Sequence, residues 1–279
     1  MFDRVVVVDW SASSRPVRGR DSIWIATADA GSGDIRTTNP ATRSDACGEL
    51  DELCRRPGTT LLGVDFSLGY PAGTARALRL NGTPWRAMWS LLAELVIDAD
   101  DNANNRFEVA AELNRRIGAG PGPFWGCPPQ RCSPTLTKTK VLADSLAEWR
   151  IVENQLRRAG RRPFSGWQLL GAGSVGSQSL VGIPRLLQLE RSLSAAGRTV
   201  EVWPFGSWEG VLPVPDVVIA EVWPSLYVLP ELHGRVRDEV QVIETARRLK
   251  EVAAVEFGAQ VTDELAQLVR DEEGWVLGA

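Results

Sequence analysis

Histidine is nearly absent from this 279-residue chain, in which His233 is the only one. A cysteine nucleophile paired with a histidine base is therefore not expected, because this one histidine has no cysteine partner nearby in the sequence. General acid and base chemistry at neutral pH would depend on metal-bound water or on a carboxyl group with a shifted pKa. The scarcity of histidine thus directs attention to the Asp and Glu residues.

Cysteine is also scarce, and its four positions are Cys47, Cys54, Cys127 and Cys132. In a chain of this size whose first residues do not resemble a secretory leader, they predict reduced thiols and a cytoplasmic location. Zinc binding by Cys127 and Cys132 would require two further ligands, and no tightly spaced second pair supplies them. We therefore expect neither a disulfide framework nor a zinc site.

Long apolar runs are missing as well. No stretch approaches the roughly 18 uninterrupted apolar residues of a membrane span, so we expect no membrane association. The net charge of -4 argues against a strongly basic nucleic-acid binder. The charge is nevertheless uneven, with 14 Lys and Arg against 9 Asp and Glu in residues 76–164, and 6 against 15 in residues 201–279. The basic middle is either a phosphate-binding face or an ordinary solvated surface.

Three short apolar runs in the chain each end on a carboxylate. The runs and their acids are 5–8 with Asp9, 61–64 with Asp65, and 217–220 with Glu221. Such runs are typical of buried strands, and open α/β sheets bind ligands at the carboxyl ends of their strands. Three acids at one sheet edge repel each other unless a divalent cation neutralises them. The pattern predicts a Mg²⁺ or Mn²⁺ site, although each acid taken singly could simply end its strand.

The rest of the pattern predicts an α/β fold with a mixed five-stranded sheet, three antiparallel strands followed by parallel ones. Strands are expected at 5–10, 22–28, 34–38, 59–66 and 217–223, with a weaker strand pattern at 199–203. Helices are expected at 44–55, 85–97, 106–117, 140–159, 178–196, 238–257 and 262–269. Residues 76–164 hold no convincing strand. They predict a helical and loop insertion or lid on a core formed by residues 1–75 and 165–279.

Several short motifs match one family. They are Val5-Val6-Val7-Val8-Asp9, the stretch from Gly63 to Pro71, Gly-x-Gly-x-x-x-x-Gln at 171–178 with Ile183-Pro184-Arg185 after it, and Glu221-Val222-Trp223-Pro224. With them the chain resembles the predicted nucleases of RNase H-like fold grouped as domain of unknown function 429. The order of strands and helices agrees with that fold, and the resemblance covers most of the chain outside residues 76–164.

The resemblance implies a metal-dependent phosphodiesterase site. Asp9 would bridge two divalent ions, Asp65 and Glu221 would be further ligands, and Asp238 is the candidate for a fourth acid at the start of a late helix. An acid in the first turn of a helix is also favoured by the helix dipole alone, so both roles stay open for Asp238. The family often shows further acids after this position, where the present chain has Gln241. The number of metal ions, one or two, therefore stays open.

Five polar residues near these motifs are candidates for binding substrate. Ser11, Ser13 and Ser67 follow two of the acids and could hydrogen-bond a phosphate, or serve only as turn residues. Gln178 and Arg185 follow the glycine stretch and could face the substrate. The glycines themselves match the dinucleotide fingerprint, but the buried strand that this motif requires does not precede them. Helix capping and close packing explain them equally well.

The leading hypothesis is a Mg²⁺- or Mn²⁺-dependent phosphodiester hydrolase that acts on nucleic acid or a nucleotide-like phosphodiester. A second hypothesis is a phosphotransferase or ATPase of the related actin-like architecture, although residues 11–19 contain less glycine than such a phosphate loop needs. A third is a non-catalytic scaffold or binding protein that keeps the fold. Nothing in the sequence indicates the oligomeric state or distinguishes DNA from RNA.

Overall fold

The centre of the molecule is a mixed six-stranded sheet. The computed structural model describes residues 2–141, 146–171, 174–206, 213–251, 257 and 262–279. The strands are β1 (Arg4–Asp9), β2 (Trp24–Asp29), β3 (Ile35–Thr38), β4 (Thr60–Val64), β5 (Val200–Trp203) and β6 (Val217–Glu221). Their order is β3-β2-β1-β4-β6-β5. β1 to β3 are antiparallel neighbours, whereas β1, β4, β6 and β5 run parallel.

The mixed α/β fold is thus confirmed, but the predicted number of five strands was wrong. The weak pattern at 199–203 forms β5, which adds a parallel edge strand next to β6. An edge strand pairs on one side only, and β5 is correspondingly short, with two of its four residues only partly buried. This incomplete burial explains why its sequence signal is weaker than the apolar runs of β1, β4 and β6.

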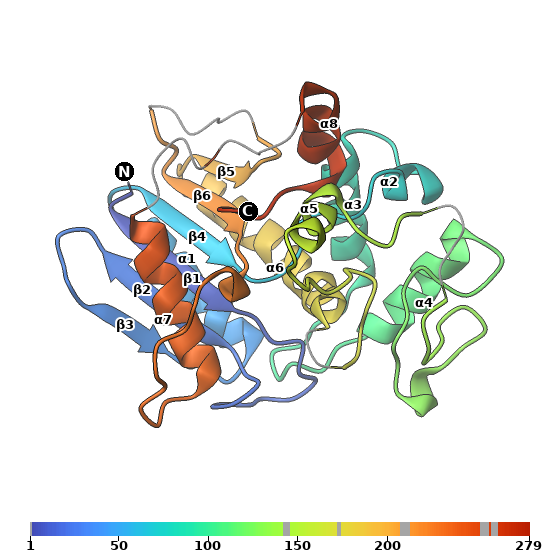
Figure 1. Ribbon diagram of the computed structural model, residues 1–279, viewed down its shortest axis with the longest axis horizontal. Helices are drawn as coiled ribbons and strands as arrows, with labels where there is room; N and C mark the ends of the chain where they lie inside the picture. Colours follow the sequence, from blue (N-terminus) through green and yellow to red (C-terminus); the bar gives the residue numbers. More distant parts are fainter. Residues whose placement is uncertain (1, 142–145, 172–173, 207–212, 252–256, 258–261) are drawn as a thin grey trace.

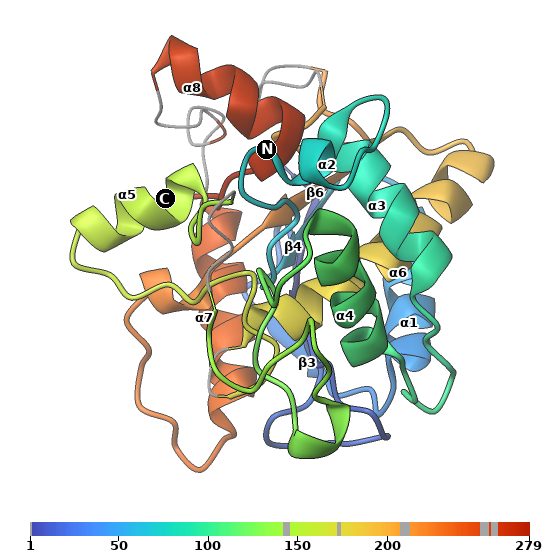
Figure 2. The same cartoon turned by 90° about the vertical axis from the view of Figure 1, so that its right-hand side faces the viewer.

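Helices cover both faces of this sheet. They are α1 (Arg43–Arg55), α2 (Thr74–Ala77), α3 (Pro84–Leu95), α4 (Arg106–Ile117), α5 (Ile151–Arg158), α6 (Val175–Ala195), α7 (Arg237–Lys250) and α8 (Asp263–Leu268). Figure 1 shows α7 crossing in front of β1 and β2, and Figure 2 shows α1, α3 and α6 on the opposite face. The sheet is therefore the middle of three layers, and α7 lies over β2 and over β1, whose last residue is Asp9.

Side chains along each central strand alternate between these two layers. Val6 and Val8 of β1 belong to the apolar cluster formed with α1, α3 and α6. Val5 and Val7 belong to a second cluster, formed with α7 and the C-terminal segment. The same alternation continues in β4, where Leu62 faces the first cluster and Leu61 the second. The position of a residue along its strand therefore decides which helix layer its side chain meets.

Most predicted helices occur within a few residues of their expected bounds, but the one expected at 140–159 was too long. Only α5 (Ile151–Arg158) forms in that range, and residues 142–145 of the expectation lie outside the described residues. Its start is fixed by a capping box in which Glu153 accepts from the backbone N–H of Arg150 at 2.7 Å. The expected end of the helix at 238–257 also includes residues 252–256, which are not described.

The segment predicted as an insertion contributes directly to the core. Trp85, Met88 and Trp89 of α3 are buried in the cluster that includes the inner face of β1 and β4. Trp89 also donates a hydrogen bond from Nε1 to the carbonyl of Leu68, 2.8 Å away. In the described part of the chain, no helix has both the length and the apolar character to cross a membrane.

Candidate functional site

Asp9 and Asp65 lie side by side at the carboxyl ends of two adjacent parallel strands. Val8 of β1 is in register with Val64 of β4, and the backbone N–H of Asp65 donates to the carbonyl of Val8 at 3.2 Å. Side chains two or four residues apart on a strand point to the same face. Asp9 lies two residues after Val7 and Asp65 four residues after Leu61, so both side chains lie on the face covered by α7. Adjacent parallel strands were expected to bring three acids together, and they do so for Asp9 and Asp65.

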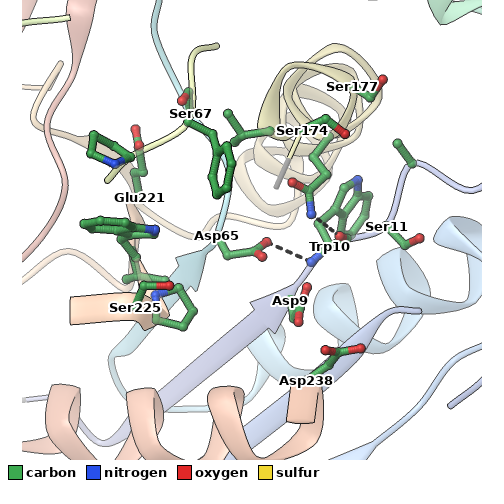
Figure 3. Close-up of a pocket in the computed structure, with 18 of the residues that line it drawn as sticks. Asp9, Trp10, Ser11, Asp65, Ser67, Ser174, Ser177, Glu221, Ser225 and Asp238 are labelled. Atoms are coloured by element: carbon green, nitrogen blue, oxygen red, sulfur yellow. Dashed lines mark hydrogen bonds between the residues drawn. The ribbon is translucent and has the colours of Figure 1, made fainter. Parts of the chain in front are cut away.

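Asp238 reaches the same place from the first turn of α7. Figure 3 shows its carboxylate facing that of Asp9, with Asp65 beyond. One oxygen of Asp238, Oδ2, accepts the backbone N–H of Asp21 at 2.7 Å. Asp21 adopts a left-handed conformation with φ of 55°, a backbone region that Asp tolerates better than most residues. Helix α7 therefore supplies a third carboxylate, held by the loop between β1 and β2.

Burial and mutual repulsion shift the proton equilibria of these acids. Burial is the largest cause that raises the pKa of Asp9 far above its usual value, and the nearby Asp65 raises it further. Burial also raises the pKa of Asp65 to about 6, although its hydrogen bond from Trp10 acts in the opposite direction. The pKa of Asp238 is raised, mainly by burial. The three acids therefore form a site that favours an added proton or an added cation.

Glu221 does not join this group, although its strand is the direct neighbour of β4. Glu221 is in register with Val64, one residue before Asp65, so its side chain points to the opposite face of the sheet. Figure 3 shows it on the far side of Asp65 from Asp9. Its oxygens accept from Arg150 at 2.8 and 2.6 Å and from the backbone N–H of Leu68 at 3.1 Å. Its charge is thus already neutralised by a buried arginine.

Both groups of acids line one cavity of about 530 Å³. Polar residues of the β1–β2 loop and the start of α6 form part of its wall, and apolar side chains form another part. The apolar lining includes Leu156, Pro163, Phe164, Leu170, Trp223 and Pro224. A cavity of this size, apolar on one side and with convergent polar groups on the other, is typical of a site for a small molecule or a single nucleotide.

Four of the five predicted substrate-binding residues line this cavity, namely Ser11, Ser13, Ser67 and Gln178. The hydroxyl of Ser11 donates to the carbonyl of Asp21 at 3.3 Å, and the amide of Gln178 donates to the carbonyl of Trp10. These two bonds hold Trp10 and Ser11, the residues directly after Asp9, in place. Of the glycine stretch, residues 172 and 173 lie outside the described residues, and α6 begins just after it at Val175.

Arg185, the fifth predicted residue, does not reach the cavity. Its guanidinium donates to Asp98 at 2.8 Å, and the same carboxylate pairs with the fully buried Arg43. Arg43 in turn donates to the carbonyls of Ser11 and Ser13 at 2.9 and 2.8 Å. Arg185 therefore belongs to a buried ion-pair network that supports the loop after Asp9 from behind.

Sequence patterns did not single out four charged residues that line the cavity, namely Asp21, Arg106, Arg150 and Glu153. Asp21 lies in a polar turn and Arg106 at the start of a helix. Neither residue ends an apolar run or belongs to a recognised motif. Arg150 lies where the predicted helix suggested an interior position. The surplus of basic residues in 76–164 was the only signal that included Arg106 and Arg150.

The tryptophans of the basic segment mostly serve the core. Trp85, Trp89 and Trp167 are 7%, 0% and 1% exposed, so they present no face on which a base could stack. The cavity wall instead uses the exposed Phe164 and the partly buried Trp223. These three tryptophans therefore pack in the core.

The donor set at the acidic end suits a hard divalent cation. Within the described residues, no group of three or more His, Cys, Asp or Glu side chains is arranged to hold a metal ion by itself. Mg²⁺ is commonly bound by one or two carboxylates together with waters and substrate phosphates rather than by a complete protein cage. Asp9 and Asp65, with Asp238 opposite, match that incomplete type of site.

Comparisons with known proteins add no assignment: no protein-family model, no curated protein and no solved structure matches this chain.

Proposed function

We propose that this protein is a divalent-metal-dependent phosphodiester hydrolase of RNase H-like fold, akin to the predicted nucleases of domain of unknown function 429. The observation that carries the proposal is the pairing of Asp9 and Asp65 at the ends of adjacent parallel strands, with Asp238 facing them across a cavity. The antiparallel β1 to β3, followed by the parallel β4 and β6, supports the same fold.

Asp9, Asp65 and Asp238 are the residues that would hold Mg²⁺ or Mn²⁺. When bound, a divalent cation supplies Lewis-acid activation of the phosphate and lowers the pKa of a water molecule. A divalent cation there would offset the burial and the repulsion from Asp65 that raise the pKa of Asp9, and also the burial that raises the pKa of Asp65. Carboxylates in this state are poor proton donors, so their role in the proposal is to bind and orient.

Backbone donors fix the orientation of two of these acids. The N–H of Trp10 donates to Oδ1 of Asp65 at 2.8 Å, and the N–H of Asp21 donates to Oδ2 of Asp238 at 2.7 Å. Each bond occupies one carboxylate oxygen, and in this proposal the second oxygen of each would be the metal ligand. Such supporting bonds keep metal ligands in a productive geometry and are as important as the ligands themselves.

Glu221 has a different role in this proposal from the one that the family resemblance implies. Its pairing with Arg150 places a neutralised carboxylate beside the cavity rather than a fourth ligand. We therefore assign Glu221 to holding Arg150 and the N–H of Leu68 in place. Asp9, Asp65 and Asp238 remain as the ligand set.

The test is Mn²⁺ titration by calorimetry, run with a cleavage screen on single-stranded, double-stranded and hybrid nucleic acids and on ATP. Asp9→Asn should abolish both binding and cleavage, while Asp34→Asn, an exposed aspartate in the turn before β3, should change neither. Metal-dependent cleavage that survives Asp9→Asn would overturn the proposal. Hydrolysis of ATP without cleavage of nucleic acid would instead favour the phosphotransferase of actin-like architecture.

A further inference from the structure

Arg106 is a cation on the cavity wall that lacks a carboxylate partner within the described residues. Its Nε donates to the hydroxyl of Ser177 at 3.0 Å, and its Nη1 donates to Ser14 Oγ and Asn104 Oδ1, both at 2.8 Å. All three acceptors are neutral. Buried arginines elsewhere in the chain, such as Arg43 and Arg150, pair directly with carboxylates.

The position of Arg106 is electrostatically unfavourable without an anion. It is the first residue of α4, where the positive end of the helix dipole opposes a cation. Its partner Ser177 lies in the first turn of α6, so a second helix N-terminus faces the same guanidinium. Burial lowers the pKa of Arg106 to about 10, which still leaves it charged at neutral pH. An anion in the cavity would balance this charge.

The cavity therefore has two ends of opposite character. The acidic end consists of Asp9, Asp65 and Asp238, and the basic end consists of Arg106 with the hydroxyls of Ser174 and Ser177. Figure 3 shows Ser174 and Ser177 at α6, with Trp10 between them and Asp9 in this view. Two anionic positions in one cavity fit a ligand with successive phosphates.

The size and the apolar lining limit which polyanion can enter. A volume of about 530 Å³ accommodates a nucleotide, and only a single strand can present an unpaired base to the apolar part of the wall. Phe164 and Leu170 are 44% and 45% exposed at the wall, and Trp223 lies beside them in the lining. Exposed aromatic and apolar faces of this kind stack against unpaired bases.

We infer that Arg106 binds a backbone phosphate of single-stranded nucleic acid, next to the phosphate that is cleaved at the acidic end. This inference rests on the proposed function for the second of these two phosphates, but binding by Arg106 does not require the metal. DNA and RNA share the phosphate that Arg106 recognises. Double-stranded nucleic acid offers no unpaired base to the apolar wall and should therefore bind more weakly.

The test is fluorescence polarisation of labelled oligonucleotides of about 12 nucleotides, measured in EDTA so that no hydrolysis occurs. The variant is Arg106→Gln, and the control is Arg115→Gln, an exposed arginine on the same helix that pairs with Glu112. Arg106→Gln should weaken binding of oligothymidylate and oligouridylate by about tenfold, and Arg115→Gln by less than about twofold. Thermal melts of both variants establish that they are folded.

The salt dependence gives a second, independent readout. Loss of one phosphate contact to a single strand should reduce the slope of log K against log salt by about 0.7, and Arg106→Lys should retain that slope. Equal binding of wild type and folded Arg106→Gln, or equal affinity for duplex and single strand, would overturn the inference. Arg106-dependent binding without cleavage under any metal would refute the hydrolase and leave the inference standing. Metal-dependent cleavage that is unaffected by Arg106→Gln would support the hydrolase and refute the role of Arg106.

Discussion

The backbone N–H of Trp10 donates a hydrogen bond of 2.8 Å to Oδ1 of Asp65, so the residue after one acid orients the next acid. The carbonyl of the same Trp10 accepts from the side chain of Gln178 on α6. One peptide segment at the end of β1 is thus held on both sides, by β4 and by α6. This arrangement keeps two like charges close together, although burial and repulsion oppose it.

The first prediction concerns stability against pH in metal-free protein. The folded-state pKa values of Asp9 and Asp65 are raised. The protonated acids therefore contribute fully to the free energy of unfolding only below about pH 4, the usual pKa range of Asp. This contribution is lost as the pH rises through about 6, the pKa of Asp65. Asp9→Asn should therefore be more stable than wild type at neutral pH by about 1–3 kcal/mol, and this advantage should vanish near pH 4.

Urea denaturation in EDTA across that pH range measures this difference in the free energy of unfolding. Asp34→Asn, an exposed aspartate, should give a curve parallel to that of wild type. Parallel curves for wild type and Asp9→Asn would show that the acidic pair carries no strain.

The second prediction is that Mn²⁺ affinity depends on the aspartates and not on Glu221. Glu221→Gln should keep its Mn²⁺ affinity within about twofold of wild type, whereas Asp65→Asn should lose at least about tenfold. The reason is that Glu221 points to the opposite face of the sheet and pairs with Arg150. Isothermal titration with Mn²⁺ provides the comparison. A similar loss in both variants would restore Glu221 to the ligand set.

The third prediction concerns the buried ion pairs of Arg150. Burial alone would lower the pKa of Arg150, but Glu153 and Glu221 raise it above its usual value. Arg150→Met leaves both glutamates buried without a counter-charge, and this should lower the free energy of unfolding by about 3–5 kcal/mol. Guanidinium denaturation gives the value.

The double variant Arg150→Met, Glu221→Gln is the internal control for that measurement. The double variant removes one of the two glutamate charges that Arg150→Met leaves without a partner. Its loss of free energy of unfolding should therefore be smaller than the sum of the two single losses by about 0.5–3 kcal/mol. Strict additivity would mean that Arg150 and Glu221 do not depend on one another, against the 2.6 Å contact between them.

Much of this fold follows from local sequence pattern, and the site follows only in part. The buried runs before Asp9 and Asp65 predict adjacent parallel strands because a strand enclosed on both faces must be apolar throughout. The role of Glu221 was not predictable, because a shift of one residue in strand register reverses the face of its side chain. Register depends on the whole sheet, and no local pattern in the sequence encodes it.

Residues brought in from loops and helix starts were the least predictable. Arg106 and Asp21 are placed at the cavity by contacts with distant segments of the chain. Arg106 donates to Ser177, and the backbone N–H of Asp21 donates to Asp238. Neither belongs to a periodic pattern or a motif, so composition alone could only indicate that the middle of the chain is basic. That Arg106 and Asp21 line the same cavity as Asp9 and Asp65 therefore emerged only from the structure.

The last prediction uses two glycines inside helices. A Cβ on Gly182 of α6 would lie 2.3 Å from Cζ of Phe66, whereas one on Gly48 of α1 would meet nothing within 4 Å. Gly182→Ala should therefore cost about 1–3 kcal/mol through overpacking. Gly48→Ala should stabilise the chain by about 0.5–1 kcal/mol, because alanine has the better helix propensity.

The pair of variants also connects packing to the site. Phe66 directly follows Asp65, and its ring contacts that of Trp10 with centroids 5.9 Å apart. Displacement of Phe66 by Gly182→Ala should therefore disturb Asp65 and lower Mn²⁺ affinity as well as stability, while Gly48→Ala should leave Mn²⁺ affinity unchanged. Thermal melts and Mn²⁺ calorimetry on both variants measure the two effects. Full Mn²⁺ affinity in a destabilised Gly182→Ala would show that the acidic pair is held by Trp10 and β1 without help from α6.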